Sequence, residues 1–359
     1  MFRSIHIRNF RCFQDFSLGS LERINLIAGK NNVGKTGMLE AIFLHLGPGS
    51  PELAVRVNLL RGIEPPDLNI ENACGSLFHN FDLDHPIRIL SRADDETVRE
   101  IELSLIESPS KRVILDNGKS HVPFSTESSV SGNGAKELRI QYHDTLGQSS
   151  TTTAHLVEEN KKTSMTIERD KLVESPPGVF NTTESGFSAK DVERFSKLEE
   201  LGQESSVVEI LRSLEPRLRR LTVLAKGTSP TVYGDIGASR LIPLPLLGEG
   251  MTRVFALVLA ISVSPNGVVL KDEFENGLHY SVLRLVWKAI AEAARHWDTQ
   301  IFATTHSFEC IRAAHDAMEE AGVYDFRLHR LDRIDGEIRA VSYDREMLTT
   351  ALVTDLEVR

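Results

Sequence analysis

Apolar and polar positions near the start of the chain follow a strand, loop and helix order. Residues 5–7 alternate apolar and polar side chains, which predicts a strand with one buried face. The run Ile24 to Ala28 is largely apolar, as in a strand buried on both faces. Helical spacing then relates Met38, Leu39, Ile42 and Phe43. We therefore predict that residues 29–36 form a loop between a buried strand and a helix.

The last third of the chain has the same mixture of strands and helices. The longest apolar run, Val254 to Val263, predicts a buried helix and is too short to cross a bilayer. Apolar strands are predicted at 267–270 and 300–304, and polar side chains follow each of them. Residues 326–341 are predicted to form a hairpin that turns at Asp335-Gly336.

The middle of the chain has a weaker pattern. Alternating segments between residues 87 and 140 predict β-strands, with turn signals at 116–118 and 132–134. The polar runs at 149–153 and 176–188 predict loops. Helical spacing returns at residues 190–221.

These patterns predict how the chain is divided. Residues 1–90 and 223–359 are expected to form one α/β domain. Residues 91–222 are expected to form an insertion that is β-rich at first and then helical.

Composition and charge restrict the location and the partners. The 359 residues carry a formal net charge of −10, so the overall field does not attract nucleic acid. The N-terminus lacks the apolar stretch of a signal peptide, and the three cysteines have no metal-binding or redox spacing. We expect a cytoplasmic protein that is not bound to a membrane. The cluster Arg217, Arg219 and Arg220 has two interpretations: contact with DNA or a partner, or a solvated face with local ion pairs.

A phosphate-binding motif occupies the predicted first loop. The segment reads GxxxxGKT, which is a Walker A pattern between a strand and a helix. Glycines let backbone N–H groups wrap closely around phosphate oxygens, and the start of the helix adds positive partial charge. Lys35 is expected to reach the β- and γ-phosphates of ATP, and the Thr36 hydroxyl is expected to bind Mg²⁺. The residues expected to contact the nucleotide here are Gly29, Asn31, Asn32, Val33, Gly34, Lys35 and Thr36.

An apolar strand that ends in two acids gives the second motif. Residues 268–270 lead through Lys271 to Asp272 and Glu273, a Walker B pattern. We expect Asp272 to hold Mg²⁺ through water and Glu273 to polarise the attacking water. Lys271 stands where an apolar residue is expected. Either its long side chain extends out of the strand end to solvent, or it perturbs the adjacent acids.

A histidine follows the next predicted strand. His306 comes one helix and one strand after the Walker B segment, within Thr304-Thr305-His306-Ser307. A histidine at the end of a neighbouring strand can reach the γ-phosphate. The candidate catalytic residues are therefore Lys35, Glu273 and His306.

The order of these motifs resembles that of the ABC-type ATPases. The segments that carry the resemblance are Asn9-Phe10-Arg11, the Walker A loop, Leu246-Leu247-Gly248-Glu249-Gly250, Asp272-Glu273, Glu275-Asn276-Gly277-Leu278-His279 and His306. Within that family, the chain is most similar to the AAA-type ATPase core of the OLD and RecF-like proteins, over roughly residues 1–90 and 220–359. The resemblance implies an α/β fold, that of a P-loop NTPase of the ABC-type ATPase head, with an inserted β-rich and helical subdomain.

The resemblance also implies roles for residues outside the Walker motifs. Arg11 would lie near the nucleotide, and residues 276–279 would be the D-loop that touches a partner subunit. His306 would be the switch histidine. Asn80 is a weak candidate for the Q-loop position.

A further implied role is that of the signature loop. Gly248, Glu249 and Gly250 would cap the γ-phosphate of ATP bound by a second subunit. The helix that follows would point its N-terminus at that phosphate. Leu247 and Glu249 depart from the common form of this loop, and a carboxylate near a triphosphate is electrostatically unfavourable.

Three functions are compatible with such a head that binds ATP and Mg²⁺. We favour an ATPase that forms an ATP-dependent dimer or higher homo-oligomer and controls a separate effector. That effector could be a nuclease in DNA maintenance or in defence against phage. OLD-like proteins carry a nuclease domain after the head, but this chain stops at Arg359 without a visible acidic cluster. Any nuclease is thus expected on another polypeptide.

The second hypothesis is a RecF- or SMC-like repair ATPase that binds DNA directly. The insertion is too short and too β-rich for the long arms of SMC proteins. The third hypothesis is the ATPase subunit of a membrane transporter. The Asn9-Phe10-Arg11 opening is untypical of such subunits.

Overall fold

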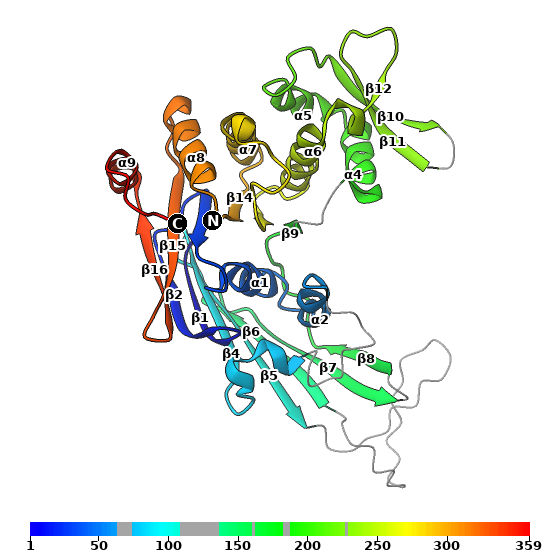
Figure 1. Cartoon of the computed structure of the whole chain (residues 1–359). Helices are drawn as coiled ribbons and strands as arrows, with labels where there is room; N and C mark the ends of the chain where they lie inside the picture. The colour runs from blue at the N-terminus through cyan, green and yellow to red at the C-terminus, as the bar shows by residue number, and fades with distance from the viewer. Residues whose placement is uncertain (63–73, 108–135, 160–161, 182–186, 227–228) are drawn as a thin grey trace.

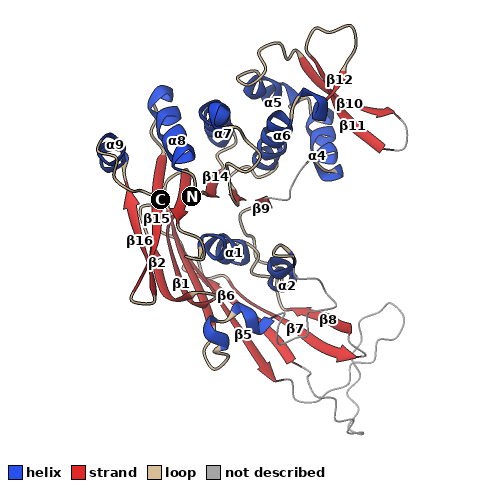
Figure 2. Ribbon diagram, viewed as in Figure 1, coloured by secondary structure: helices blue, strands red, loops and turns tan. Residues whose placement is uncertain are grey.

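The chain forms two large sheets, with a helix between them and further helices outside. The computed structural model describes residues 1–62, 74–107, 136–159, 162–181, 187–226 and 229–359. Helix α1 (Lys35–His45) lies between the two sheets, and a small third sheet lies at one end of the molecule (Figure 1). Figure 2 shows a group of helices on the other side of the sheet that contains β14. The predicted α/β class is confirmed.

The first large sheet carries the predicted phosphate-binding loop. Its strand order is β16-β15-β3-β14-β13-β9, with β16 antiparallel to β15 and the other neighbours parallel. The strands are β3 (Ile24–Gly29), β9 (Gly178–Asn181), β13 (Val268–Lys271), β14 (Gln300–Thr304), β15 (Phe326–Ile334) and β16 (Glu337–Tyr343). Because β3, β14 and β13 are parallel neighbours, the residues that follow them meet at one edge of the sheet.

The second large sheet is antiparallel and has the strand order β2-β1-β4-β5-β6-β7-β8. Its strands are β1 (Phe2–Phe10), β2 (Phe13–Leu18), β4 (Ile87–Ala93), β5 (Val98–Glu107), β6 (Lys136–Asp144), β7 (Ser149–Glu159) and β8 (Lys162–Arg169). One apolar core joins this sheet to α1 and to the first sheet. It includes Ile7 and Ile89 from the second sheet, Ile42 from α1, and Leu270 and Phe302 from the first sheet.

Helices cover the opposite face of the first sheet. They are α4 (Ala189–Glu200), α5 (Glu204–Leu211), α6 (Glu249–Ser262), α7 (Leu283–His296), α8 (Phe308–Ala321) and α9 (Arg345–Val353). Helix α2 (Glu52–Leu59) instead lies beside α1, and its buried apolar residues belong to the core between the two large sheets (Figure 1). In α7, Val286, Ile290 and Ala293 recur on one face at helical spacing and are all buried. No helix in the described part of the chain has an apolar stretch that could span a membrane.

The third sheet packs beside α4 and α5. It contains β10 (Arg220–Lys226), β11 (Ser229–Asp235) and β12 (Ile242–Pro243), and a short 3-10 helix (Leu244–Leu247) connects it to α6. Figure 1 places this group at the end of the molecule away from β7 and β8.

Several predicted elements are confirmed, and two predicted loops are wrong. The strands predicted at 5–7, 24–28 and 300–304 lie within β1, β3 and β14. The polar run 149–153 lies in β7, because its backbone pairs with both β6 and β8. The predicted loop 176–188 contains β9, which pairs with β13 at the sheet edge. The turn signals at 116–118 and 132–134 lie outside the described residues.

The predicted domain boundary at residue 90 falls inside β4. The segment 91–222 supplies β5 to β8 to the second large sheet and β9 to the first. Its later part contains α4 and α5, as the helical spacing predicts, but Arg220 and Leu221 already belong to β10. The division into two domains stays a prediction.

Candidate nucleotide-binding site

The loop between β3 and α1 is tightly wound. Gly29 and Gly34 have φ values of 144° and 95°, which side-chain-bearing residues rarely adopt. A Cβ on Gly29 would lie 2.5 Å from the Leu331 carbonyl oxygen, and one on Gly34 would lie 2.6 Å from Cys12 Sγ. Glycine is therefore needed at both ends of the loop, for conformation and for space.

The Lys35 side chain is held by the carbonyl groups of this loop. Its Nζ donates to the Gly29 oxygen at 2.6 Å and to the Lys30 oxygen at 2.9 Å. Burial lowers the pKa of Lys35, and the nearby carboxylates Asp272, Glu275 and Glu273 oppose that shift in this order. The ammonium group thus lies on the loop and within electrostatic reach of all three acids.

Three neighbouring elements bring their polar ends together at Asp272. The Thr36 hydroxyl, at the start of α1, donates to Asp272 Oδ2 at 3.0 Å. The Thr304 hydroxyl, at the end of β14, donates to Asp272 Oδ1 at 2.5 Å. The parallel neighbours β3, β14 and β13 produce this meeting, although Thr36 and Asp272 are 236 residues apart in sequence.

This donor set suits a magnesium ion. Mg²⁺ prefers oxygen ligands and is usually held by one or two carboxylates together with substrate phosphates. Thr36 and Asp272 supply a hydroxyl and a carboxylate, already in contact, beside the phosphate-binding loop. The residues therefore fit the ion that the sequence predicts.

The second Walker B acid lies in an unusual backbone conformation. Glu273 has a φ of 46°, and its N–H donates to the Thr304 hydroxyl at 2.8 Å. A left-handed φ at a residue other than glycine is uncommon and costs on the order of 1 kcal/mol or more. The contact with Thr304 ties this turn to the same cluster as Asp272.

His306 lies next to a third acid. Its backbone N–H donates to Glu275 Oε1 at 3.0 Å, and its ring Nδ1 lies 3.1 Å from the same oxygen. The histidine side chain is 57% exposed, whereas that of Glu275 is 11% exposed. Glu275 thus lies beneath an accessible histidine at the carboxyl end of the sheet.

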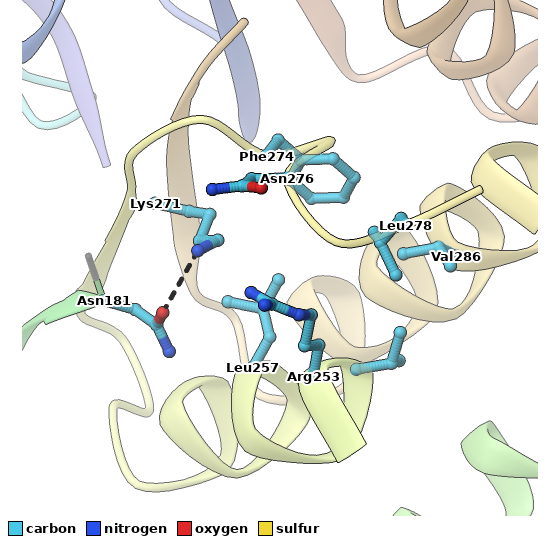
Figure 3. Close-up of a pocket in the computed structure, with 9 residues that line it drawn as sticks. Asn181, Arg253, Leu257, Lys271, Phe274, Asn276, Leu278 and Val286 are labelled. Carbon is cyan, nitrogen blue, oxygen red and sulfur yellow. Dashed lines mark hydrogen bonds between the residues drawn. The ribbon is translucent and has the colours of Figure 1, made fainter. Parts of the chain in front are cut away.

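Of the two alternatives for Lys271, extension of its side chain to solvent is wrong. The residue is buried, and its Nζ donates to Asn181 Oδ1 at 3.3 Å (Figure 3). It lines a small cavity, of about 20 Å³, with Arg253 from α6 and Asn276 from the turn after β13. Burial is the main cause that lowers the pKa of Lys271 to about 8, and Arg253 adds to it.

The predicted signature loop begins α6. Gly248 is the N-cap residue of α6, with a φ of 117°, and a Cβ there would meet no atom within 4 Å. The Glu249 side chain is 70% exposed and lies 2.7 Å from Arg253 Nη2. Part of the carboxylate charge at the signature loop is therefore balanced within the same helix.

Arg253 also links α6 to the predicted D-loop. A Cβ on Gly277 would lie 2.3 Å from Arg253 Nε, and Gly277 itself has a φ of 72°. The guanidinium therefore packs directly on this turn. Sequence reasoning did not identify Arg253.

Arg11 lies beside α1, and Asn80 lies in a turn before β4. The Arg11 guanidinium pairs with Glu40 at 3.2 Å and donates to Asn58 Oδ1 and to the Ser76 carbonyl. Asn80 lies in a left-handed turn and contacts His79. The position of Arg11 near the nucleotide and the assignment of Asn80 to the Q-loop stay predictions.

No role was assigned from the sequence to two residues of the site, Thr304 and Glu275. Thr304 and Glu275 each lie within a quoted motif, but neither was given a role. The available signal was position, because Thr304 ends an apolar strand and Glu275 lies three residues after Asp272.

Comparisons with known proteins identify the family of the chain. The family described as "AAA domain, putative AbiEii toxin, Type IV TA system" matches residues 24–311, which contain both Walker motifs and His306. A protein of Helicobacter pylori named "ATP/GTP phosphatase" is 22% identical over 335 residues, which are 89% of each chain.

Solved structures of SMC heads are also similar. The SmcHead bound to the C-winged helix domain of ScpA aligns with 97% of this chain and 99% of its own, at 12% identity and a TM-score of 0.49. The SMC head domain from Thermotoga maritima aligns with 96% of this chain and 99% of its own, at 12% identity and a TM-score of 0.46. Because the family match spans most of the chain, the protein belongs to this AAA-domain family and is a P-loop ATPase.

Proposed function

We propose that the chain binds ATP with Mg²⁺ between the Walker A loop and the Walker B acids and hydrolyses it there. The observation that supports this most is the direct contact of Thr36 with Asp272. It joins the start of the phosphate-binding helix to the end of a strand from the opposite end of the sequence.

Each side chain then has a distinct task. The amides of residues 29–34 and the Lys35 ammonium bind phosphate oxygens, and Thr36 and Asp272 hold the metal ion. When bound, Mg²⁺ neutralises charge on the phosphates. Glu273 orients and polarises the attacking water, and His306 contacts the γ-phosphate.

We further propose that ATP joins two copies of the chain. Gly248, Glu249 and Gly250 would cap the nucleotide of the second copy, and residues 276–279 would touch it. Two observations support this: the space beside Gly248 is open, and Leu246, just before it, is 75% exposed. The pairing of Glu249 with Arg253 reduces the repulsion expected between Glu249 and phosphate.

The biological role that we favour is OLD- or RecF-like control of a separate effector, such as a nuclease, in the cytoplasm. The family description, which names a toxin of a Type IV TA system, is compatible with a role in defence. Direct DNA binding and membrane transport remain the alternatives. Arg217 pairs with Glu215 at 2.9 Å and Arg220 lies 3.9 Å from Asp235, which leaves less free positive charge for DNA.

Substitution of the water-activating acid tests the proposed reaction. We expect Glu273→Gln to lower kcat for ATP hydrolysis by about 100-fold or more, because general-base contributions are of that order. With Mg-ATP present, the variant should also remain in a dimer or larger assembly. Phosphate release and light scattering measure the two effects, with Asp316→Asn, on an exposed face of α8, as the control. Normal turnover by Glu273→Gln would remove Glu273 from the mechanism.

A further inference from the structure

A largely buried carboxylate under His306 has no task in the reaction described above. Glu275 Oε1 accepts the backbone N–H of His306 at 3.0 Å and lies 3.1 Å from its ring Nδ1. One oxygen atom therefore fixes both the backbone and the ring of the same residue. The ring is otherwise largely exposed, so this contact restricts its orientation.

The environment of the second carboxylate oxygen of Glu275 indicates that the acid acts on its neighbours through its negative charge. Oε2 is buried and accepts no hydrogen bond from any residue that the structure describes. A buried carboxylate oxygen without a hydrogen bond is costly unless a nearby donor or cation compensates its charge. His306 is the donor that contacts the acid, and Glu275 exerts an attractive field on the ammonium groups of Lys35 and Lys271.

Glu275 also connects His306 to the segment expected to face a second subunit. Its carbonyl oxygen accepts the N–H of Leu278 at 3.0 Å, which closes the turn that carries Gly277. Arg253 of α6 packs on that glycine. A continuous set of contacts therefore runs from the signature helix through this turn to the histidine.

We infer that Glu275 is a positioning residue, which holds the His306 ring toward the γ-phosphate and links that orientation to the turn at residues 275–278. The inference rests on the proposed contact of His306 with the γ-phosphate. Glu275 itself is not expected to touch the nucleotide. Its loss should therefore lower kcat while the affinity for ATP is retained.

A double-mutant cycle tests this role. We expect Glu275→Ala to lower kcat by about 10- to 100-fold, as small misplacements of catalytic groups do, with the Kd for Mg-ATP changed by less than about threefold. Glu275→Gln keeps an oxygen that can accept the His306 N–H and should recover most of the lost kcat. In the His306→Ala background, Glu275→Ala should lower kcat by less than about twofold, because its target is absent.

The controls separate failure of this inference from failure of the proposed site. Glu309→Gln removes a carboxylate from the first turn of α8 that contacts Ser307 rather than His306, and should leave kcat unchanged. If His306→Ala lowers kcat but the Glu275→Ala loss persists in full in that background, Glu275 does not act through His306. If His306→Ala hydrolyses ATP at the wild-type rate, both the proposed contact of His306 with the γ-phosphate and the role of Glu275 are overturned.

Unfolding midpoints of all variants show whether a loss of kcat reflects a destabilised fold. If Glu275→Ala lowers kcat and Glu275→Gln does not recover it, the positioning role is contradicted.

Discussion

At the scale of single residues, two lysines in and near the candidate site have different surroundings. Burial lowers the pKa of both Lys35 and Lys271. Lys35 donates to loop carbonyl groups at the edge of the site. Lys271 is buried beneath it, with Asn181 as its hydrogen-bond acceptor. Lys35 lies on the predicted phosphate-binding loop, whereas the charge of Lys271 is buried at a cost to stability.

The cost of Lys271 predicts a pH dependence of folding. Arg253, Asp272, Glu273 and Glu275 all act on this ammonium, and the net result is a folded-state pKa of about 8, below the ordinary value of 10.5. Below pH 8 the side chain is charged in both states, so the folded state bears the full cost. Between about pH 8 and 10.5 the unfolded chain binds more protons, so this residue makes stability rise with pH.

We expect Lys271→Met to raise the free energy of unfolding at pH 7 and to remove that rise. The difference between a pKa of 10.5 and one of about 8 corresponds to about 3.5 kcal/mol as an upper limit, since one pKa unit is about 1.4 kcal/mol. Urea unfolding from pH 7 to 10.5, without nucleotide and Mg²⁺, measures it, and Lys190→Met on the surface is the control. An unchanged pH slope in Lys271→Met would show that the buried charge is not the cause.

At the scale of elements, tight turns fix how the site is assembled. Gly277 closes the turn after β13 and lies against Arg253, whereas Gly336 turns the β15–β16 hairpin in open space. Both have positive φ values, 72° and 87°. They therefore share the conformational requirement for glycine and differ in whether a neighbour fills the space of a Cβ.

This difference predicts unequal costs of two alanine substitutions. Gly336→Ala should cost about 1 kcal/mol, the usual penalty for a left-handed alanine. Gly277→Ala should cost about twice as much, because its Cβ must also displace the Arg253 guanidinium and disturb the Arg253–Glu249 pair. Chemical denaturation of both variants gives the comparison. Equal losses would mean that Arg253 moves aside freely.

The elements that sequence predicts well are those with a local cause. The Asp335-Gly336 turn and the loop that begins at Gly29 were predictable because their backbone conformations favour glycine there. The strands β7 and β9 were not predictable, because they form by pairing with strands that are distant in the sequence or not recognisable from the local pattern. The polar run that starts β7 forms a strand because β6 and β8 pair with it. The segment of β9 forms a strand because it pairs with β13.

The same distinction applies to the candidate site. Lys35, Thr36, Asp272 and Glu273 were predictable from local motifs at strand ends. The support given by Thr304 and Glu275 depends on which strands become neighbours. Spacing within a motif does not reveal that arrangement, which is also why the burial of Lys271 beneath the turn was missed.

At the scale of the whole molecule, two distant parts of the chain build one site. Helix α1 is held between the two large sheets by apolar side chains from both, so its first turn has a fixed place relative to β13. The group of α4, α5 and the third sheet adjoins α6, whose start is the predicted signature loop. The strands β5 to β8 and the helices α4 and α5, all from the predicted insertion, thus lie toward opposite ends of the molecule (Figure 1).

The central claim is that the Walker A loop and the Walker B acids together hold Mg-ATP, and calorimetric titration tests it most directly. We expect wild type and Lys30→Ala, which removes an exposed side chain of the same loop, to bind Mg-ATP within about threefold of each other. Lys35→Ala should lose about 100-fold or more, because two or more charge-assisted hydrogen bonds to phosphate are lost at about 1.5–3 kcal/mol each. Binding of Mg-ATP by Lys35→Ala with wild-type affinity would contradict the account.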